Sequence, residues 1–212
     1  MATQTRLDHE TRKHQIVGAA RDIIASRGIG SLTTRAIAEQ VGVTEAALYR
    51  HVRSKDEVLL LLAGEIREAL FREITKATAS DRRALDKLEH LLRLHLSDVE
   101  SRQGISFVVI AEALQFGEAR VRAAMRDLVD DYMALVERLI VEGQEKGEIS
   151  VKVSASAAAT TFFGMVQATV TRWLLDAKGH PLTENVGGLW ELFRLSVTPA
   201  QARLGPNGIK PR

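Results

Sequence analysis

A short stretch near the start of the chain combines hydrogen-bond donors with two helix-like segments separated by a glycine. Guanidinium groups at Arg35 and Arg50 could donate to O6 and N7 of a guanine, and an alanine could contact a thymine methyl group. Side chains suited to donate to phosphate oxygens surround them: Thr33, Thr34, Thr44, Tyr49, His51 and Lys55. These residue types at this spacing indicate recognition of a nucleic acid duplex.

Two short helices must position these groups. Helical periodicity covers Thr34 to Val41 and Thr44 to about Val52, with Gly42 in the turn between them. At about 100° per residue, Leu48 and Val52 face inward together. The side chains left for contact with DNA are Glu45, Ala46, Ala47, Tyr49, Arg50 and His51. The pattern predicts a helix-turn-helix, whose second helix enters the major groove.

Glu45 is compatible with two interpretations. A carboxylate repels phosphates unless it accepts a hydrogen bond, for example from N4 of a cytosine. Glu45 is equally compatible with a solvated position at the start of a helix, where the helix dipole favours negative charge. The sequence leaves both interpretations open.

The rest of the chain predicts helices only. All four prolines follow residue 180, and no alternating strand pattern occurs between turn signals. Ser54 and Glu57 form a capping box before an apolar run, so a long helix begins there. About nine helices are predicted in an all-α fold: 11–27, 34–41, 44–52, 54–79, 82–100, 105–116, 117–147, 154–178 and 183–197.

These helices suggest a division into three parts. Residues 1–54 are expected to form an N-terminal three-helix helix-turn-helix DNA-binding domain. A C-terminal helical bundle for ligand binding and dimerisation is expected at 55–200, followed by a flexible Pro- and Gly-rich tail at 201–212. The last two helices, about 154–178 and 183–197, carry apolar residues on more than one face, so they are the predicted homodimer surface.

Seven side chains of the rear helices are candidates for lining a ligand cavity: His95, Phe107, Met125, Tyr132, Phe163, Gln167 and Trp173. For any one of them taken alone, ordinary core packing is the favoured explanation. Because the rear segments are apolar and weakly charged, the expected effector is a small hydrophobic or amphipathic molecule. His90 and His95 are five residues apart and do not share a helix face as a zinc pair does, so we expect no metal.

Composition excludes several other classes. The 212 residues contain no cysteine, which excludes disulfides, thiolate metal sites and cysteine nucleophiles. The longest purely apolar run, Val58 to Ala63, is too short to span a membrane, and the polar start lacks the apolar core of a signal peptide. No phosphate-binding or nucleophile motif occurs. We therefore expect a cytoplasmic protein without enzyme activity or cofactor.

The charge is unevenly distributed along the chain. Residues 1–55 contain nine basic and five acidic residues, whereas the whole chain has a net charge of only +2. The first quarter of the chain is therefore the part suited to approach a polyanion.

The stretch from Thr33 to Glu57 resembles the DNA-binding signature of the TetR family of transcriptional regulators. Isoleucine-alanine, Gly-Val-Thr, Leu-Tyr-x-His and Ser-Lys fall at the spacings of that family. The resemblance implies that Arg35, Glu45, Ala46 and Ala47 read bases. It also implies a set of phosphate contacts: Thr34, Thr44, Tyr49, His51 and Lys55.

The expected function is that of a repressor. A dimer would bind a near-palindromic double-stranded operator, with half-sites about 34–36 Å apart or a multiple of that distance. A small-molecule effector would release it. The alternative is an architectural or nucleoid-organising DNA-binding protein without a small-molecule switch.

Overall fold

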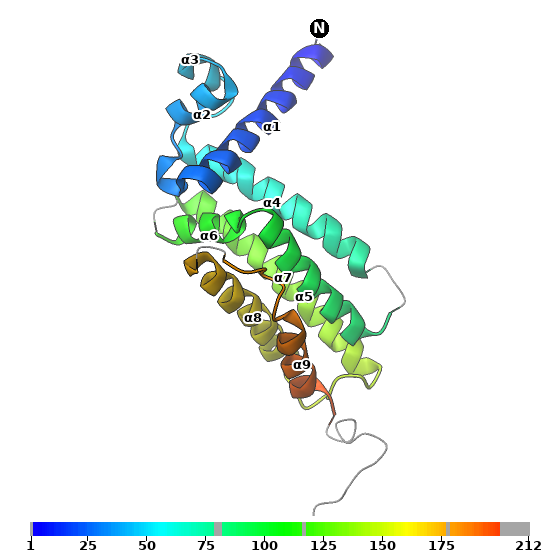
Figure 1. Ribbon diagram of the computed structural model, residues 1–212. Helices are drawn as coiled ribbons and strands as arrows, with labels where there is room; N and C mark the ends of the chain where they lie inside the picture. The colour runs from blue at the N-terminus through cyan, green and yellow to red at the C-terminus, as the bar shows by residue number, and fades with distance from the viewer. Residues whose placement is uncertain (1, 79–81, 116–117, 177–178, 200–212) are drawn as a thin grey trace, which may run out of the picture. The chain divides into compact units, whose positions relative to one another are not determined.

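The computed structural model describes residues 2–78, 82–115, 118–176 and 179–199, and these contain helices and loops without any strand. The prediction of an all-α fold is confirmed. The elements, labelled as in Figure 1, are α1 (Ala2–Arg27), the 3₁₀ turn η1 (Ile29–Ser31), α2 (Thr34–Val41), α3 (Glu45–Leu48), α4 (Lys55–Thr78), α5 (Ala84–Ser101), α6 (Ile105–Gln115), α7 (Ala119–Glu145), α8 (Ala155–Leu175) and α9 (Val186–Val197).

The described residues form two compact units, and both units are discontinuous in sequence. The head unit combines Met1–Ala69 with Arg102–Leu128, so it contains α1 to α3, most of α4, α6 and the start of α7. The body unit is formed by the described residues of Leu70–Ser101 and Val129–Arg212. The predicted tail at 201–212 lies outside the described residues.

The core of the head unit forms where α1 packs on α2 and α2 packs on α3. Ile16 and Ile23 of α1 are fully buried, as are Ile37 of α2 and Leu48 at the end of α3. Figure 1 shows α2 and α3 on one side of the long helix α1. Burial of this apolar side of α1 fixes the two short helices relative to each other.

The body unit packs α8 and α9 beside α5 (Figure 1). Phe162 of α8 is fully buried and meets Phe193 of α9 edge to face, with ring centroids 5.3 Å apart. Trp190 also contacts Phe193, with ring centroids 5.9 Å apart. Aromatic packing therefore joins the last two helices within one protomer.

Two helix limits differ from the sequence prediction by more than three residues. Helix α1 begins at Ala2, not at Thr11, because the polar first residues contain no glycine or proline that would stop a helix. Helix α3 ends at Leu48, and the chain tightens there, since His51 N donates to the Leu48 carbonyl three residues back at 2.8 Å. None of the helices in the described ranges is long and apolar enough to cross a membrane.

Candidate nucleic-acid interface

The turn between α2 and α3 is defined by caps at both helices. Thr33 Oγ1 accepts a hydrogen bond from Ala36 N at 3.0 Å, which begins α2. Gly42, with φ +76°, ends that helix in the left-handed conformation that glycine adopts without steric cost. Thr44 Oγ1 then accepts from Ala47 N at 3.2 Å and begins α3. Both capping hydroxyl groups still carry a hydrogen that can be donated to a phosphate.

The second helix presents the side that its periodicity predicts. Leu48 and Val52 are fully buried, while Ala46 and Arg50 are exposed. Ala47 and His51 are half-buried at the edges of the exposed side. Because alanine is short, the backbone of α3 can approach a base edge closely over this side.

Thr34, Glu45 and Tyr49 form a hydrogen-bonded cluster between α2 and the second helix. Thr34 Oγ1 donates to Glu45 Oε1 at 3.0 Å and lies 3.3 Å from Tyr49 Oη. The ring of Tyr49 is 48% exposed. The carboxylate of Glu45 thus has a partner on α2 that neither interpretation from the sequence included, and both of those interpretations remain predictions.

Arg35 projects from the exposed side of α2. Its Nε donates to Glu39 Oε1 at 3.0 Å, and its side chain is 79% exposed. The hydrogen bond and charge of Glu39, with the charge of Glu45, raise the already high pKa of Arg35, so the guanidinium stays charged. The ion pair engages Nε alone, and the two Nη groups can form the paired donors that a guanine edge requires.

Lys55, the first residue of α4, has a carboxylate partner that the sequence analysis did not identify. Its Nζ donates to Glu112 Oε1 of α6 at 2.6 Å. The preceding cap forms as predicted, because Ser54 Oγ accepts from Glu57 N at 3.2 Å. The start of the long helix is therefore held both by its own cap and by α6.

The seven candidate cavity residues are divided between the two units. In the body unit, His95 Nδ1 and Tyr132 Oη are 2.9 Å apart, and the ring of Phe163 lies 5.7 Å from that of Tyr132. Gln167 Oε1 is buried without a hydrogen-bond partner, whereas Trp173 Nε1 donates to the His180 carbonyl at 2.9 Å. The remaining two candidates belong to the head unit: Phe107 and Met125.

Burial keeps the His95–Tyr132 pair uncharged. It lowers the pKa of His95 to about 4 and raises the pKa of the Tyr132 hydroxyl. Because the unfolded chain protonates His95 near pH 6.5 and the folded chain does not, stability should fall as the pH drops from about 6.5 to about 4, by up to about 3 kcal/mol. Urea unfolding at several pH values measures this loss.

His95→Gln is the comparison for this prediction, since glutamine keeps a polar side chain that does not titrate. The variant should lose the part of the pH dependence that His95 contributes between pH 6.5 and 4. Equal pH dependence in the two proteins would contradict the prediction.

The described geometry, a capped pair of short helices with an exposed donor-rich side, defines the class of helix-turn-helix DNA-binding transcriptional regulators. Family comparison gives the finer assignment. A sequence model for "Bacterial regulatory proteins, tetR family" matches residues 16–62. A second one, for "YsiA-like protein, C-terminal region", matches residues 65–195. The chain belongs to the TetR family. The predicted domain boundary after residue 54 stays a prediction.

Curated relatives match most of the chain. The nucleoid occlusion factor SlmA of Aliivibrio fischeri is 26% identical over 88% of this chain and 95% of its own length. SlmA of Vibrio vulnificus is 27% identical over the same shares of the two chains. These proteins are similar along both the head and the body sequences.

Solved structures with the same fold include two regulators named FadR. FadR from Bacillus halodurans has a TM-score of 0.77 and 24% identity, covering 86% of this chain and 94% of that protein. FadR from Bacillus subtilis, solved in complex with stearoyl-CoA, has a TM-score of 0.76 and 23% identity, covering 85% and 96%. At these identities the similarity establishes the fold.

Proposed function

We propose that this TetR-family protein is a repressor that binds a near-palindromic operator as a dimer and is released by a small hydrophobic or amphipathic effector. The observation that carries the proposal is the exposed side of the helix-turn-helix, where short side chains on the second helix lie beside Arg35 and the Thr34–Tyr49 pair. One such unit reads only a few base pairs, so specific binding requires a second copy.

Base and phosphate contacts are assigned to different residues. Arg35 is proposed to read bases, together with the start of the second helix at Glu45, Ala46 and Ala47, while Arg50 is a second guanidinium on the exposed side. Phosphates are assigned to the hydroxyl, imidazole and amino groups around this side: Thr33, Thr34, Thr44, Tyr49, His51 and Lys55. The base contact by Arg35 is supported by the 79% exposure of its side chain, which leaves the guanidinium accessible to a base edge.

Arg35→Ala and Tyr49→Ala should therefore have different effects. Losing Arg35 removes a base contact. At one operator position, the difference in binding free energy between the preferred base pair and the others should therefore shrink by about 1–3 kcal/mol. Losing Tyr49 removes a phosphate contact and should weaken binding to all duplexes by similar factors. Selection of the operator from random DNA, followed by mobility shifts on the operator and its single-base variants, measures both effects.

Ser97→Ala, on the exposed side of α5, is a suitable control because it changes a surface residue of the body unit outside α8 and α9. It should bind every duplex as the unmodified protein does. Unchanged mobility shifts with Tyr49→Ala would count heavily against the assignment of this surface to DNA.

The dimer is assigned to α8 and α9, which expose small and apolar residues side by side. Leu175 of α8 is 80% exposed and Leu192 of α9 is 70% exposed. A Cβ atom added at Gly164, Gly187 or Gly188 would meet nothing within 4 Å, so packing within the protomer does not require these glycines. Close approach of a second copy would explain them.

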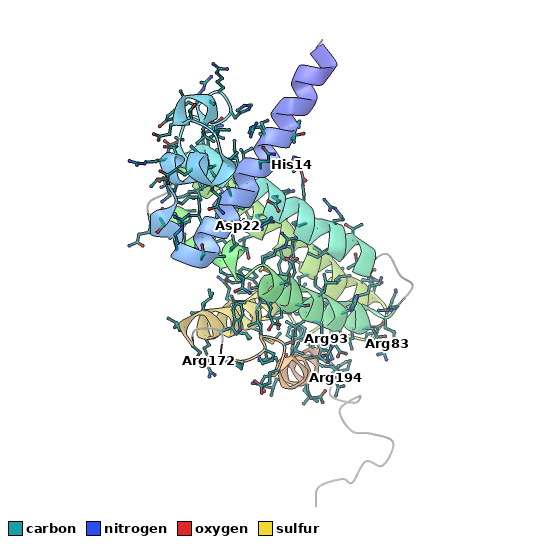
Figure 2. All side chains as sticks on the ribbon, turned by 45° about the horizontal axis from the view of Figure 1, so that its top comes forward. His14, Asp22, Arg83, Arg93, Arg172 and Arg194 are labelled. Atoms are coloured by element: carbon teal, nitrogen blue, oxygen red, sulfur yellow. The ribbon has the colours of Figure 1, made fainter. Side chains whose placement is uncertain are left out.

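Charged side chains are few on these two helices. Figure 2 shows Arg172 on α8 and Arg194 on α9. Arg194 donates to Glu191 through Nε at 2.9 Å and Nη2 at 2.6 Å. A symmetric pairing of α8 and α9 therefore brings few uncompensated charges into contact.

The effector site is proposed among the uncharged buried groups of the body unit. The His95–Tyr132 pair and the ring of Phe163 offer apolar surface, and Gln167 Oε1 offers an unpaired acceptor. An amphipathic molecule with an apolar chain and a donor group fits this chemistry. The stearoyl-CoA bound by B. subtilis FadR supplies a probe of that type.

A thermal-shift comparison of stearoyl-CoA, stearate and coenzyme A alone tests the effector site. Ligands that bind the folded state raise the unfolding temperature. The acyl compounds should raise it more than coenzyme A does. If no apolar compound stabilises the protein, the effector part of the proposal fails and DNA binding is unaffected.

The SlmA relatives favour a second candidate function, DNA binding for nucleoid organisation without a small-molecule switch. Occupancy of the chromosome separates the two functions. Binding at a few promoters supports the repressor, whereas many dispersed sites support nucleoid organisation.

A further inference from the structure

The Lys55–Glu112 ion pair links the start of α4 to the middle of α6 inside the head unit. The atoms are 2.6 Å apart, and the two residues are 57 positions apart in sequence. The side chain of Glu112 is 12% exposed and that of Lys55 is 34% exposed. This pair is thus partly shielded from water, unlike the exposed pair formed by Arg35 and Glu39.

Partial burial makes the pair costly to open. If Lys55 turned away, the Glu112 carboxylate would keep its charge with little access to water. The ammonium group has three hydrogens, and one of them is already committed to Glu112 Oε1. A phosphate approaching Lys55 therefore meets a cation whose charge is largely neutralised.

Glu112 also lies on an element held firmly in the head unit. Ile105, Val109 and Ala113 of α6 are all buried, and α6 contacts α1 and η1. Its carboxylate therefore has a defined position relative to the first turn of α4.

We propose that Glu112 is a positioning residue that competes with DNA phosphates for the ammonium group of Lys55. This inference rests on the proposed function, because it takes Lys55 as a phosphate contact. The position of α6 then sets how much of the Lys55 charge a duplex can use. Any conformational change that separates Glu112 from Lys55 strengthens the phosphate contact, and any change that tightens the pair weakens it.

Salt dependence is the readout that a merely structural role would not change. Each phosphate neutralised by a cation steepens the plot of log affinity against log salt by about 0.9. Glu112→Gln removes the competing charge, so the slope should steepen by about one unit for each bound protomer. From about 50 to 200 mM salt, its affinity should fall about threefold further per protomer than that of the unmodified protein.

The experiment uses the full chain on the selected operator and on an unrelated duplex of equal length. Glu112→Gln should bind both more tightly at low salt, because phosphates are common to both. The same substitution combined with Lys55→Met should lose the gain. Equal slopes for Glu112→Gln and the unmodified protein, or a gain that persists without Lys55, would overturn the proposal.

Glu89→Gln is the charge-matched control. Glu89 pairs with Arg93, both on α5 in the body unit, at 2.8 Å, and it is not one of the predicted DNA contacts. Arg93 is labelled in Figure 2. The control substitution changes the net charge by the same amount and should leave the slope unchanged. Should Glu112→Gln be unstable, Glu112→Ala gives the same test.

Failure of the proposed function has a different signature. In that case the unmodified protein shows no salt-dependent binding, or Tyr49→Ala binds DNA normally. If Tyr49→Ala weakens binding while Glu112→Gln changes nothing, only the competition between Glu112 and phosphate is wrong.

Discussion

Leu192→Arg is expected to convert the protein to a monomer and to weaken operator binding by about a thousandfold or more. Leu192 is 70% exposed on α9, at the proposed dimer surface. In a two-fold dimer each substitution occurs twice on one surface, so two new positive charges enter the contact. A monomer retains mainly the non-specific affinity, which is typically 10³-fold or more weaker than specific binding.

Size-exclusion chromatography with light scattering, followed by mobility shifts on the operator, measures both parts of this prediction. Leu114→Arg is the matched control, because Leu114 is 76% exposed on α6 and lies outside α8 and α9. That variant should remain dimeric. The added arginine favours binding to DNA electrostatically, so weaker operator binding by Leu192→Arg cannot arise from its charge. A dimeric Leu192→Arg protein would exclude α9 from the interface.

Phe162→Ala should destabilise the body unit by about 3–5 kcal/mol. Phe162 is fully buried and its ring packs against Phe193 at 5.3 Å. Removing the ring takes away its apolar contacts and leaves a cavity that the surrounding helices fill only in part. The expected result is a lower urea midpoint with an unchanged slope.

Thr161→Ala, at the preceding position, provides the comparison. The Thr161 hydroxyl is exposed and donates only to the Ala157 carbonyl of its own helix at 2.9 Å. Its replacement should change stability by less than about 0.5 kcal/mol. A similarly small effect of Phe162→Ala would contradict the aromatic contact between α8 and α9.

Helical periodicity predicted the buried side of the second helix in detail. Leu48 and Val52 were expected inside and are fully buried. The cap at Ser54 could be predicted from Glu57, because the two partners are only three positions apart in sequence. Features that depend on neighbouring residues of one helix were therefore accessible without a structure.

The partners of the predicted DNA contacts were not accessible in the same way. Glu112 lies in an apolar segment whose pattern indicates only a buried helix, and nothing in it identifies Lys55 as a neighbour. Glu39 was different, since a glutamate four residues after Arg35 is a regular helical ion pair. That spacing was the available signal for Glu39, whereas the Glu112 contact required the tertiary arrangement.

The start of α1 was predicted wrongly for a reason that lies in its local sequence. The start of α1 carries no capping signal, and its apolar positions begin only where the helix becomes buried at Ile16. The pattern therefore located the packed part of the helix and missed the residues that precede it.

The discontinuous head unit has a consequence for engineered chimeras of such regulators. A graft that exchanges residues 1–54 alone would separate Arg21 from Glu65, to whose Oε1 the Arg21 Nη1 donates at 2.7 Å. It would also join a foreign segment directly to Lys55. An exchange of residues 1–69 together with 102–128 transfers both the Arg21–Glu65 and Lys55–Glu112 pairs intact. In this chain, the transferable cassette for DNA specificity consists of two sequence segments.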